Sequence, residues 1–316
     1  MTSATTIGSL GTRLTVDGHE YGGGRTEMLI RDSVLAGFTA EPRAVECLLP
    51  SDRLHPVRWF NGRALVSVLY ADWLMRLEGL PPVRFGEVGV GAMVTFGDKP
   101  APRVVPLYAG AGRPSLGHWW LCTAVTNNVA REVFATAWGE WSFIAPVHVE
   151  RGRDGLRCRV EDRHGLWLEL TASRTSKVRT SEDALISYGR RDDWLIAVHE
   201  HATMRSGTGK PGSARLQLGR HPYAELIRGL GLGDAAAFTR PMAAESEPSL
   251  SAFDEFVDIL GPARHTEPAP TDLHDGAEAP FRITHPDGTT ELVDQNLAQL
   301  PFPANAPFTA EPVTAK

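Results

Sequence analysis

The sequence predicts a β-rich α+β fold. Short stretches rich in β-branched and aromatic residues recur along most of the chain, and turn triplets such as Arg153-Asp154-Gly155 separate them. Few stretches carry apolar residues at helical spacing. Together these observations predict a single antiparallel domain, closed into a barrel or folded as a two-layer sheet, with a few flanking helices.

The composition indicates a chain that folds around a large core. It has 316 residues, 42% of them hydrophobic, and its formal net charge of -6 argues against general nucleic-acid binding. No stretch approaches the length of a membrane span, and the N-terminus lacks the apolar segment of a signal peptide. Three cysteines, Cys47, Cys122 and Cys158, lie far apart, so no disulfide framework is expected. We therefore expect a cytoplasmic protein that binds neither nucleic acid nor membrane.

Changes in composition divide the chain into three parts. Residues 1–27 are rich in glycine and threonine and are predicted to form a flexible arm or a flap. Residues 28–265 are predicted to form the folded domain. Residues 266–316 form a Pro/Ala-rich extension, in which an Asp-Gly turn indicates an isolated hairpin over residues 281–293. The rest of the extension is predicted to be unstructured or to wrap a neighbouring subunit.

The elements of the domain can be assigned in order. Residues 28–38 have strand character, and residues 39–50 predict a short helix that ends at a proline. Residues 223–231 predict another short helix, after a His-Pro turn. The remaining predicted strands are residues 54–60, 63–73, 85–96, 104–108, 118–125, 141–150, 156–161, 166–173, 184–187, 194–204 and 214–218.

Residues 127–141, with the sequence NNVAREVFATAWGEW, predict a further helix. Asn127 is a suitable N-cap residue, Val129 and Val133 recur at helical spacing, and Gly139 is a suitable stop. The helix is therefore expected to begin at a polar cap and to end in the wall of a pocket.

This stretch resembles the signature helix of the acetoacetate decarboxylase family. In that family an Arg-Glu pair is followed, after four residues, by Pro-Lys-Lys, whose first lysine forms a Schiff base with a β-keto acid. Arg131 and Glu132 match the pair, whereas Ala137, Trp138 and Gly139 stand at the three following positions. The resemblance implies the family's cone-shaped antiparallel β-barrel, with the pocket inside the cone, and a homo-oligomer. It covers roughly three quarters of the chain.

A tryptophan at the Schiff-base position changes the chemistry to be expected. Decarboxylation of a β-keto acid leaves an electron pair that an iminium accepts, and an indole has no amine to form one. The chain has four lysines, none close to this helix in sequence: Lys99, Lys177, Lys210 and Lys316. We therefore expect chemistry by proton transfer, with no cofactor.

The resemblance also implies two charged residues in the pocket. Arg31 falls where the family has an active-site arginine, although Asp32 beside it equally suits a surface ion pair. Glu87, within residues 85–96, matches a substrate-facing glutamate, and its alternative is the surface end of a strand. A lone acid within an apolar strand must be paired or functional. Glu87 and Arg31 are thus the predicted catalytic residues.

Aromatic residues are the predicted substrate-binding surface. His118, Trp119 and Trp120 directly precede the signature helix in a strand, so they are candidates to line or rim the pocket beside Trp138, and His118 and Trp120 are the two we assign to the site. Tyr70 is expected to supply a hydroxyl where the family has a second pocket glutamate. For the tryptophans and for Tyr70 the alternative is packing in the core.

Two other patterns do not predict a site. His199 and His201 share one face of a predicted strand, but without a third ligand no metal is expected. Gly86, Gly89 and Gly91 lie within a strand pattern and lack the strand–turn–helix context of a nucleotide-binding loop.

These residues predict a non-decarboxylating enzyme of specialised metabolism, such as antibiotic biosynthesis. It would catalyse a lyase, dehydratase or cyclase step on a keto or polyketide-like small molecule by general acid–base chemistry. Glu140 and His118 are reserve proton carriers. The alternatives are a non-catalytic small-molecule binder on the same fold, or a true β-keto acid decarboxylase with a lysine from elsewhere, such as Lys177.

Overall fold

The computed structural model describes residues 14–16, 19–21, 26–76, 82–99, 116–173, 178–242, 249–264 and 278–295. The helices in these ranges are α1 (Pro42–Glu46), α2 (Asn128–Thr136) and α3 (Pro222–Arg228). The strands as far as α2 are β1 (Leu14–Val16), β2 (His19–Tyr21), β3 (Thr26–Ala40), β4 (Leu54–Pro56), β5 (Ala64–Arg76), β6 (Val83–Phe96) and β7 (Leu116–Val125). The strands after α2 are β8 (Ser142–Ile144), β9 (Val147–Arg151), β10 (Gly155–Asp162), β11 (Gly165–Ser173), β12 (Val178–Arg191), β13 (Trp194–Gly207), β14 (Ala214–Leu218), β15 (Phe238–Met242), β16 (Ser249–Pro262), β17 (Phe281–Thr284) and β18 (Thr290–Leu292).

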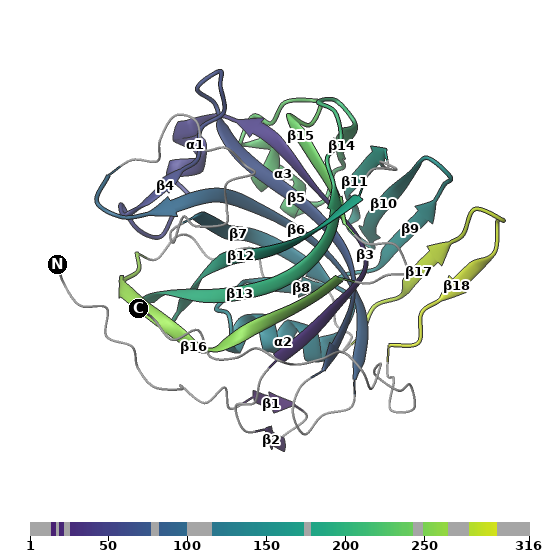
Figure 1. Ribbon diagram of the computed structural model, residues 1–316, viewed down its shortest axis with the longest axis horizontal. Coiled ribbons are helices and arrows are strands. Elements are labelled where there is room, and N and C mark those ends of the chain that lie inside the picture. The colour runs from purple at the N-terminus through teal and green to yellow at the C-terminus, as the bar shows by residue number, and fades with distance from the viewer. Residues whose placement is uncertain are drawn as a thin grey trace.

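The strands of the larger sheet pair in a closed circuit (Figure 1). β6 pairs with β5, β5 with β3, and β3 with both β15 and β16, which in turn pair with β13. β13 pairs with β12, β12 with β7, and β7 with β6 again. The pairing agrees with the predicted antiparallel barrel except between β12 and β7, which are parallel.

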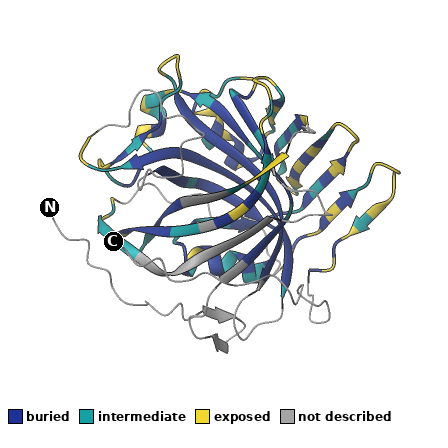
Figure 2. Cartoon of the chain, viewed as in Figure 1, coloured by how far each residue is buried: buried dark blue, intermediate teal, exposed yellow. Residues whose placement is uncertain are grey.

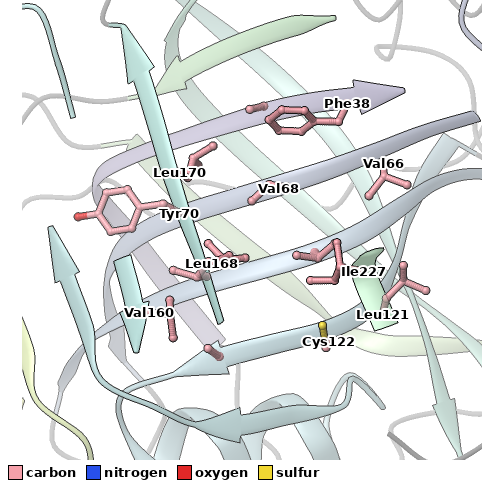
Figure 3. Packing of buried hydrophobic residues seen from close by; sticks show 14 of the residues in the cluster. Phe38, Val66, Val68, Tyr70, Leu121, Cys122, Val160, Leu168, Leu170 and Ile227 are labelled. Atoms are coloured by element: carbon pink, nitrogen blue, oxygen red, sulfur yellow. The ribbon is translucent and has the colours of Figure 1, made fainter. Parts of the chain in front are cut away.

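A second, six-stranded sheet packs against the outside of this circuit. Its strand order is β14-β11-β10-β9-β17-β18, and its inner face meets β3, β5 and β6 in the largest apolar cluster. Figure 3 shows that Val68 and Tyr70 of β5 lie beside Leu168 and Leu170 of β11 in this interface. The predicted hairpin over residues 281–293 is not isolated, because β17 pairs in parallel with β9.

A second apolar cluster fills the inside of the circuit at the end where α2 lies. Val133, Phe134 and Trp138 of α2 and the turn after it pack there against side chains from β3, β5, β6 and β13. Strands β5 and β6 are therefore covered on both faces, which Figure 2 shows as nearly continuous burial. Strands covered on both faces favour unbroken apolar runs over alternating ones.

The sequence-based boundaries differ from the structure at several elements. The helix expected at residues 39–50 is limited to α1, and the helix expected at residues 127–141 ends at Thr136. The short strand expected at residues 184–187 is part of the fourteen-residue β12. The strand expected at residues 104–108 lies outside the described residues.

None of the helices in the described part of the chain has the length and apolar content needed to cross a lipid bilayer. Much of the predicted N-terminal arm and C-terminal extension lies outside the described residues, so the domain boundaries stay a prediction.

Candidate active site

A cavity of about 330 Å³ lies inside the strand circuit. Its aromatic lining residues are Trp73, Trp120, Phe134, Trp138 and Phe238. Its polar lining residues are Glu87, His118, Glu140, Arg179, Ser181, Ser187, Glu200, Ser206, Thr208, Thr239 and Arg240. The size of the cavity and its combination of aromatic walls with polar side chains suit a small-molecule site.

Glu87 of β6 is buried in the cavity wall, with 4% of its surface exposed. The indole N–H of Trp73, on the neighbouring strand β5, donates to Glu87 Oε2 at 2.5 Å. Burial raises the pKa of Glu87 to about 8, and the nearby Glu200 adds to this rise, whereas the hydrogen bond from Trp73 opposes it. Glu87 therefore exchanges its proton close to neutral pH.

Glu140 provides a second buried carboxyl from the turn that follows α2. Its pKa is raised well above the ordinary value, first by burial and then by Glu87 and Glu200, while a hydrogen bond from Ser187 opposes the rise. Ser187 also accepts a hydrogen bond from Trp120 Nε1 at 3.2 Å. Ser187 of β12 thus connects the carboxyl to the aromatic wall.

An imidazole lies flat against this wall. The rings of His118 and Trp120 stack with centroids 5.1 Å apart and an interplanar angle of 17°. His118 Nε2 is 3.2 Å from Ser67 Oγ, and burial lowers the pKa of His118 to about 4. The imidazole is therefore neutral at pH 7, which makes it a hydrogen-bonding group and not a cation.

The glycines of β6 make room for Trp120. A Cβ atom on Gly89 would lie 2.9 Å from the Trp120 ring, and one on Gly91 would lie 2.7 Å from it. Gly89 and Gly91 therefore allow the close approach of an indole to the backbone of this strand.

Two arginines lie at the other end of the cavity. Arg240 of β15 donates from Nε to Ser206 Oγ at 2.9 Å and from NH2 to Ser181 Oγ at 3.3 Å. Arg179 and Thr208 are exposed, so this end is the mouth of the cavity. The carboxyls lie at the inner end, which α2 and the turn after it close.

Lysine is absent from the lining among the residues that the structure describes. Lys99 and Lys210 are exposed and lie outside the cavity, and Lys177 and Lys316 fall outside the described ranges. The same ranges contain no group of three or more histidine, cysteine and acidic side chains placed to hold a metal ion.

Solved structures share this arrangement of strands. The enduracididine biosynthesis enzyme MppR, complexed with the condensation product of pyruvate and imidazole 4-carboxaldehyde, has a TM-score of 0.57 at 12% identity, covering 81% of this chain and 98% of that one. An acetoacetate decarboxylase from Legionella pneumophila has a TM-score of 0.56 at 10% identity, covering 83% and 99%. This protein has the acetoacetate decarboxylase-like fold. No family model and no curated protein matches the sequence.

Four of the predicted site residues meet in the cavity of this acetoacetate decarboxylase-like fold. They come from three separate elements and are Glu87, His118, Trp120 and Trp138. Trp138 stands at the closed end beside Phe134, with ring centroids 4.6 Å apart.

Arg31 and Tyr70 do not line the cavity. Side chains alternate along β5, so Leu69 lines the cavity while Tyr70 points to the interface between the sheets. Arg31 is half-buried where the register of β3 shifts between Ile30, which lines the cavity, and Asp32, which binds Arg151. The described arginines that reach the cavity are instead Arg179 and Arg240, at its mouth.

Sequence reasoning overlooked Glu200 and Trp73. For Glu200 a signal was available in the sequence. His199 and His201 share one face of the predicted strand, so Glu200 between them belongs to the opposite face. Outward-facing His199 is 2.9 Å from Asp258 Oδ2, whereas Glu200 lines the cavity.

Proposed function

We propose that this protein is an enzyme of specialised metabolism that moves protons on a carbonyl-bearing small molecule without forming an imine. The proposal depends on one observation above all. Glu87 lies inside a largely apolar cavity, and its pKa near 8 suits a group that both donates and accepts protons near neutral pH.

The chemistry follows from the protonation state of Glu87. Below pH 8 the protonated carboxyl donates its proton to a departing hydroxyl or to a carbonyl oxygen. The carboxylate that remains takes a proton from the carbon next to the carbonyl, which restores the acid. These two steps make up an enolisation or a dehydration, and ring closure follows when a second group of the substrate attacks the new double bond.

The walls support the same proposal. The hydrogen bond from Trp73 holds the Glu87 carboxyl in place, and Trp138 offers a flat apolar surface to a conjugated keto or polyketide-like substrate. One protein with the same fold, MppR, is by name a biosynthesis enzyme for enduracididine. A homo-oligomer and a cytoplasmic location stay predictions.

The test is hydrogen exchange on small carbonyl compounds. Pyruvate, acetoacetate and 4-hydroxy-2-keto acids are incubated with the protein in D2O, and deuterium uptake and water loss are followed by NMR. Replacing Glu87 with Gln is expected to lower the rate by about 100-fold or more, the usual contribution of a general acid or base. Glu46→Gln, on the exposed helix α1, is the control.

An unchanged rate in Glu87→Gln would remove this carboxyl from the mechanism. Binding of the probes without any exchange by the native protein would favour a non-catalytic binder. Borohydride treatment with acetoacetate tests the imine-free part, because a trapped adduct on any lysine would show decarboxylase-type chemistry.

A further inference from the structure

The inner end of the cavity brings buried carboxyl groups together. Glu87 and Glu140 are both at least 95% buried. Glu200 helps to raise the pKa of Glu87, and Glu87 and Glu200 together help to raise the pKa of Glu140. No cation is among the groups that shift the pKa of either carboxyl. Two carboxyls buried together without a counter-charge are held at a cost that a bound cation would remove.

The described residues of the protein do not supply that cation. His118 is neutral because burial lowers its pKa to about 4. Arg179 and Arg240 line the same cavity, but neither is among the groups that shift the pKa of Glu87 or of Glu140. The guanidinium of Arg240 is hydrogen-bonded to Ser206 and Ser181 instead.

The surroundings of the carboxyls suit an organic cation. The indoles of Trp73, Trp120 and Trp138 line the same cavity, and the face of tryptophan is the aromatic surface that attracts cations most strongly. The indole N–H of Trp73 donates a hydrogen bond to Glu87 Oε2. The other oxygen, Oε1, accepts no hydrogen bond from a side chain that the structure describes. This oxygen belongs to a side chain that is 4% exposed and lines the cavity, so it is available to a donor on a ligand.

We infer that the inner end of the cavity binds the cationic end of the ligand, a protonated amine, amidine or guanidinium, between Glu140 and Glu87 and against the indole faces. The inference rests on the proposed function in that it names the substrate class of the same site. It goes beyond it because proton transfer by Glu87 alone requires no charge on the substrate.

A bound cation also changes Glu87. A positive charge near a carboxyl favours the ionised form, so it lowers the pKa of Glu87 and releases its proton. Binding of the correct ligand would thus convert Glu87 from an acid into a base at neutral pH. A neutral ligand of the same shape would leave it protonated.

The experiment compares three probes of one shape and different charge. Binding of benzylammonium, benzyl alcohol and benzoate to the native protein is measured by calorimetry at pH 7.5. Benzylammonium is expected to bind at least about tenfold more tightly than the other two, because it alone carries the complementary charge. Glu140→Gln is expected to weaken benzylammonium by roughly tenfold and to leave benzyl alcohol within about twofold.

The controls separate charge from packing and from folding. Glu46→Gln should bind all three probes as the native protein does. Glu140→Asp, which keeps the charge, should retain most of the preference for benzylammonium, and thermal unfolding checks that each variant is folded. Equal or tighter binding of benzoate or benzyl alcohol by the native protein would overturn the inference, as would unchanged benzylammonium binding in folded Glu140→Gln.

These results are independent of turnover. Loss of hydrogen exchange in Glu87→Gln with no charge preference among the probes would keep the proposed function and end the inference. A clear preference for benzylammonium with unchanged exchange in Glu87→Gln would keep the inference and end the proposed mechanism.

Discussion

The protein buries charged side chains in two regions and treats them in opposite ways. Between the two sheets, Arg84 donates to both oxygens of Asp72 at 3.0 and 2.9 Å, and Arg151 lies 2.9 Å from Asp32 and 3.2 Å from Asp72. Both aspartates are paired with arginine there, and Glu291 adds a third carboxylate 2.9 Å from Arg84. Inside the strand circuit, Glu87 and Glu140 are equally buried, yet they face a cavity and not a guanidinium.

The difference separates charge that holds the fold together from charge that is kept for a ligand. A buried carboxyl with a bidentate arginine stays ionised and ties its strands together. A buried carboxyl without one takes up a proton instead, which the raised pKa of both glutamates indicates. Carboxyl groups with strongly shifted pKa values are typical of functional sites.

The largest expected effect on stability is the loss of a charged partner in the paired region, by which we mean Asp32, Asp72, Arg84 and Arg151 between the two sheets. Asp72→Asn leaves Arg84 and Arg151 buried beside an amide, and such a loss costs about 3–5 kcal/mol of unfolding free energy. Urea unfolding measures it. Asp98→Asn is the matched control, because Asp98 pairs with Arg53 on the surface with 88% of its side chain exposed and should change little. A small loss in Asp72→Asn would mean that the cluster does not stabilise the fold.

The cavity carboxyls predict the opposite sign and a dependence on pH. Between pH 4.5 and about 8 the folded protein keeps the Glu87 proton that the unfolded chain has released, so stability falls as the pH rises through this window. One such group contributes at most about 1.4 kcal/mol per pH unit. Glu87→Gln removes this contribution, so the variant should be more stable than the native protein at pH 8 and similar to it at pH 4.5.

Urea unfolding at a series of pH values tests this prediction, with Glu46→Gln as the surface control. A native protein whose stability rises between pH 5 and 8 as much as that of Glu87→Gln would contradict it, because the carboxyl would then be ionised at little cost.

The smallest effect is expected at Tyr70, which faces the paired region. Its hydroxyl is buried without a hydrogen-bond partner among the described residues, and burial, followed by the charges of Asp32 and Asp72, raises its pKa. Tyr70→Phe should therefore leave the unfolding free energy unchanged or raise it by about 1 kcal/mol. Probe binding and hydrogen exchange should not change. Weaker binding in this variant would mean that Tyr70 reaches the ligand after all.

The sequence predicted the β-rich fold, and four of the six residues that it proposed for the site line the cavity. Glu87 was identifiable because an acid within an apolar strand must be paired or functional. Trp138 was identifiable because it follows a recognisable helix. The register inside the barrel could not be predicted in the same way. β5 is apolar on both faces, so its sequence does not reveal which of Leu69 and Tyr70 points inward.

Arg31 shows a second limit. The pairing of β3 with β5 shifts register between Ile30 and Asp32, so the simple alternation of side chains between the two faces is interrupted at Arg31. No glycine or proline in the sequence marks that position. The residues at the mouth of the cavity could not be predicted either. Arg179 and Arg240 are more than sixty residues apart in sequence, and only the pairing of β12, β13 and β15 brings both to the cavity.

The turn that closes the cavity limits how its end wall can evolve. Gly139 has a φ of +62°, and a Cβ atom there would lie 2.6 Å from the carbonyl oxygen of Arg190, while one on Gly189 would meet the carbonyl of Trp138. Position 139 therefore strongly favours glycine, whereas its neighbours Trp138 and Glu140 both line the cavity. The shape and charge of this wall can therefore change through those two side chains while the turn glycine between them is kept.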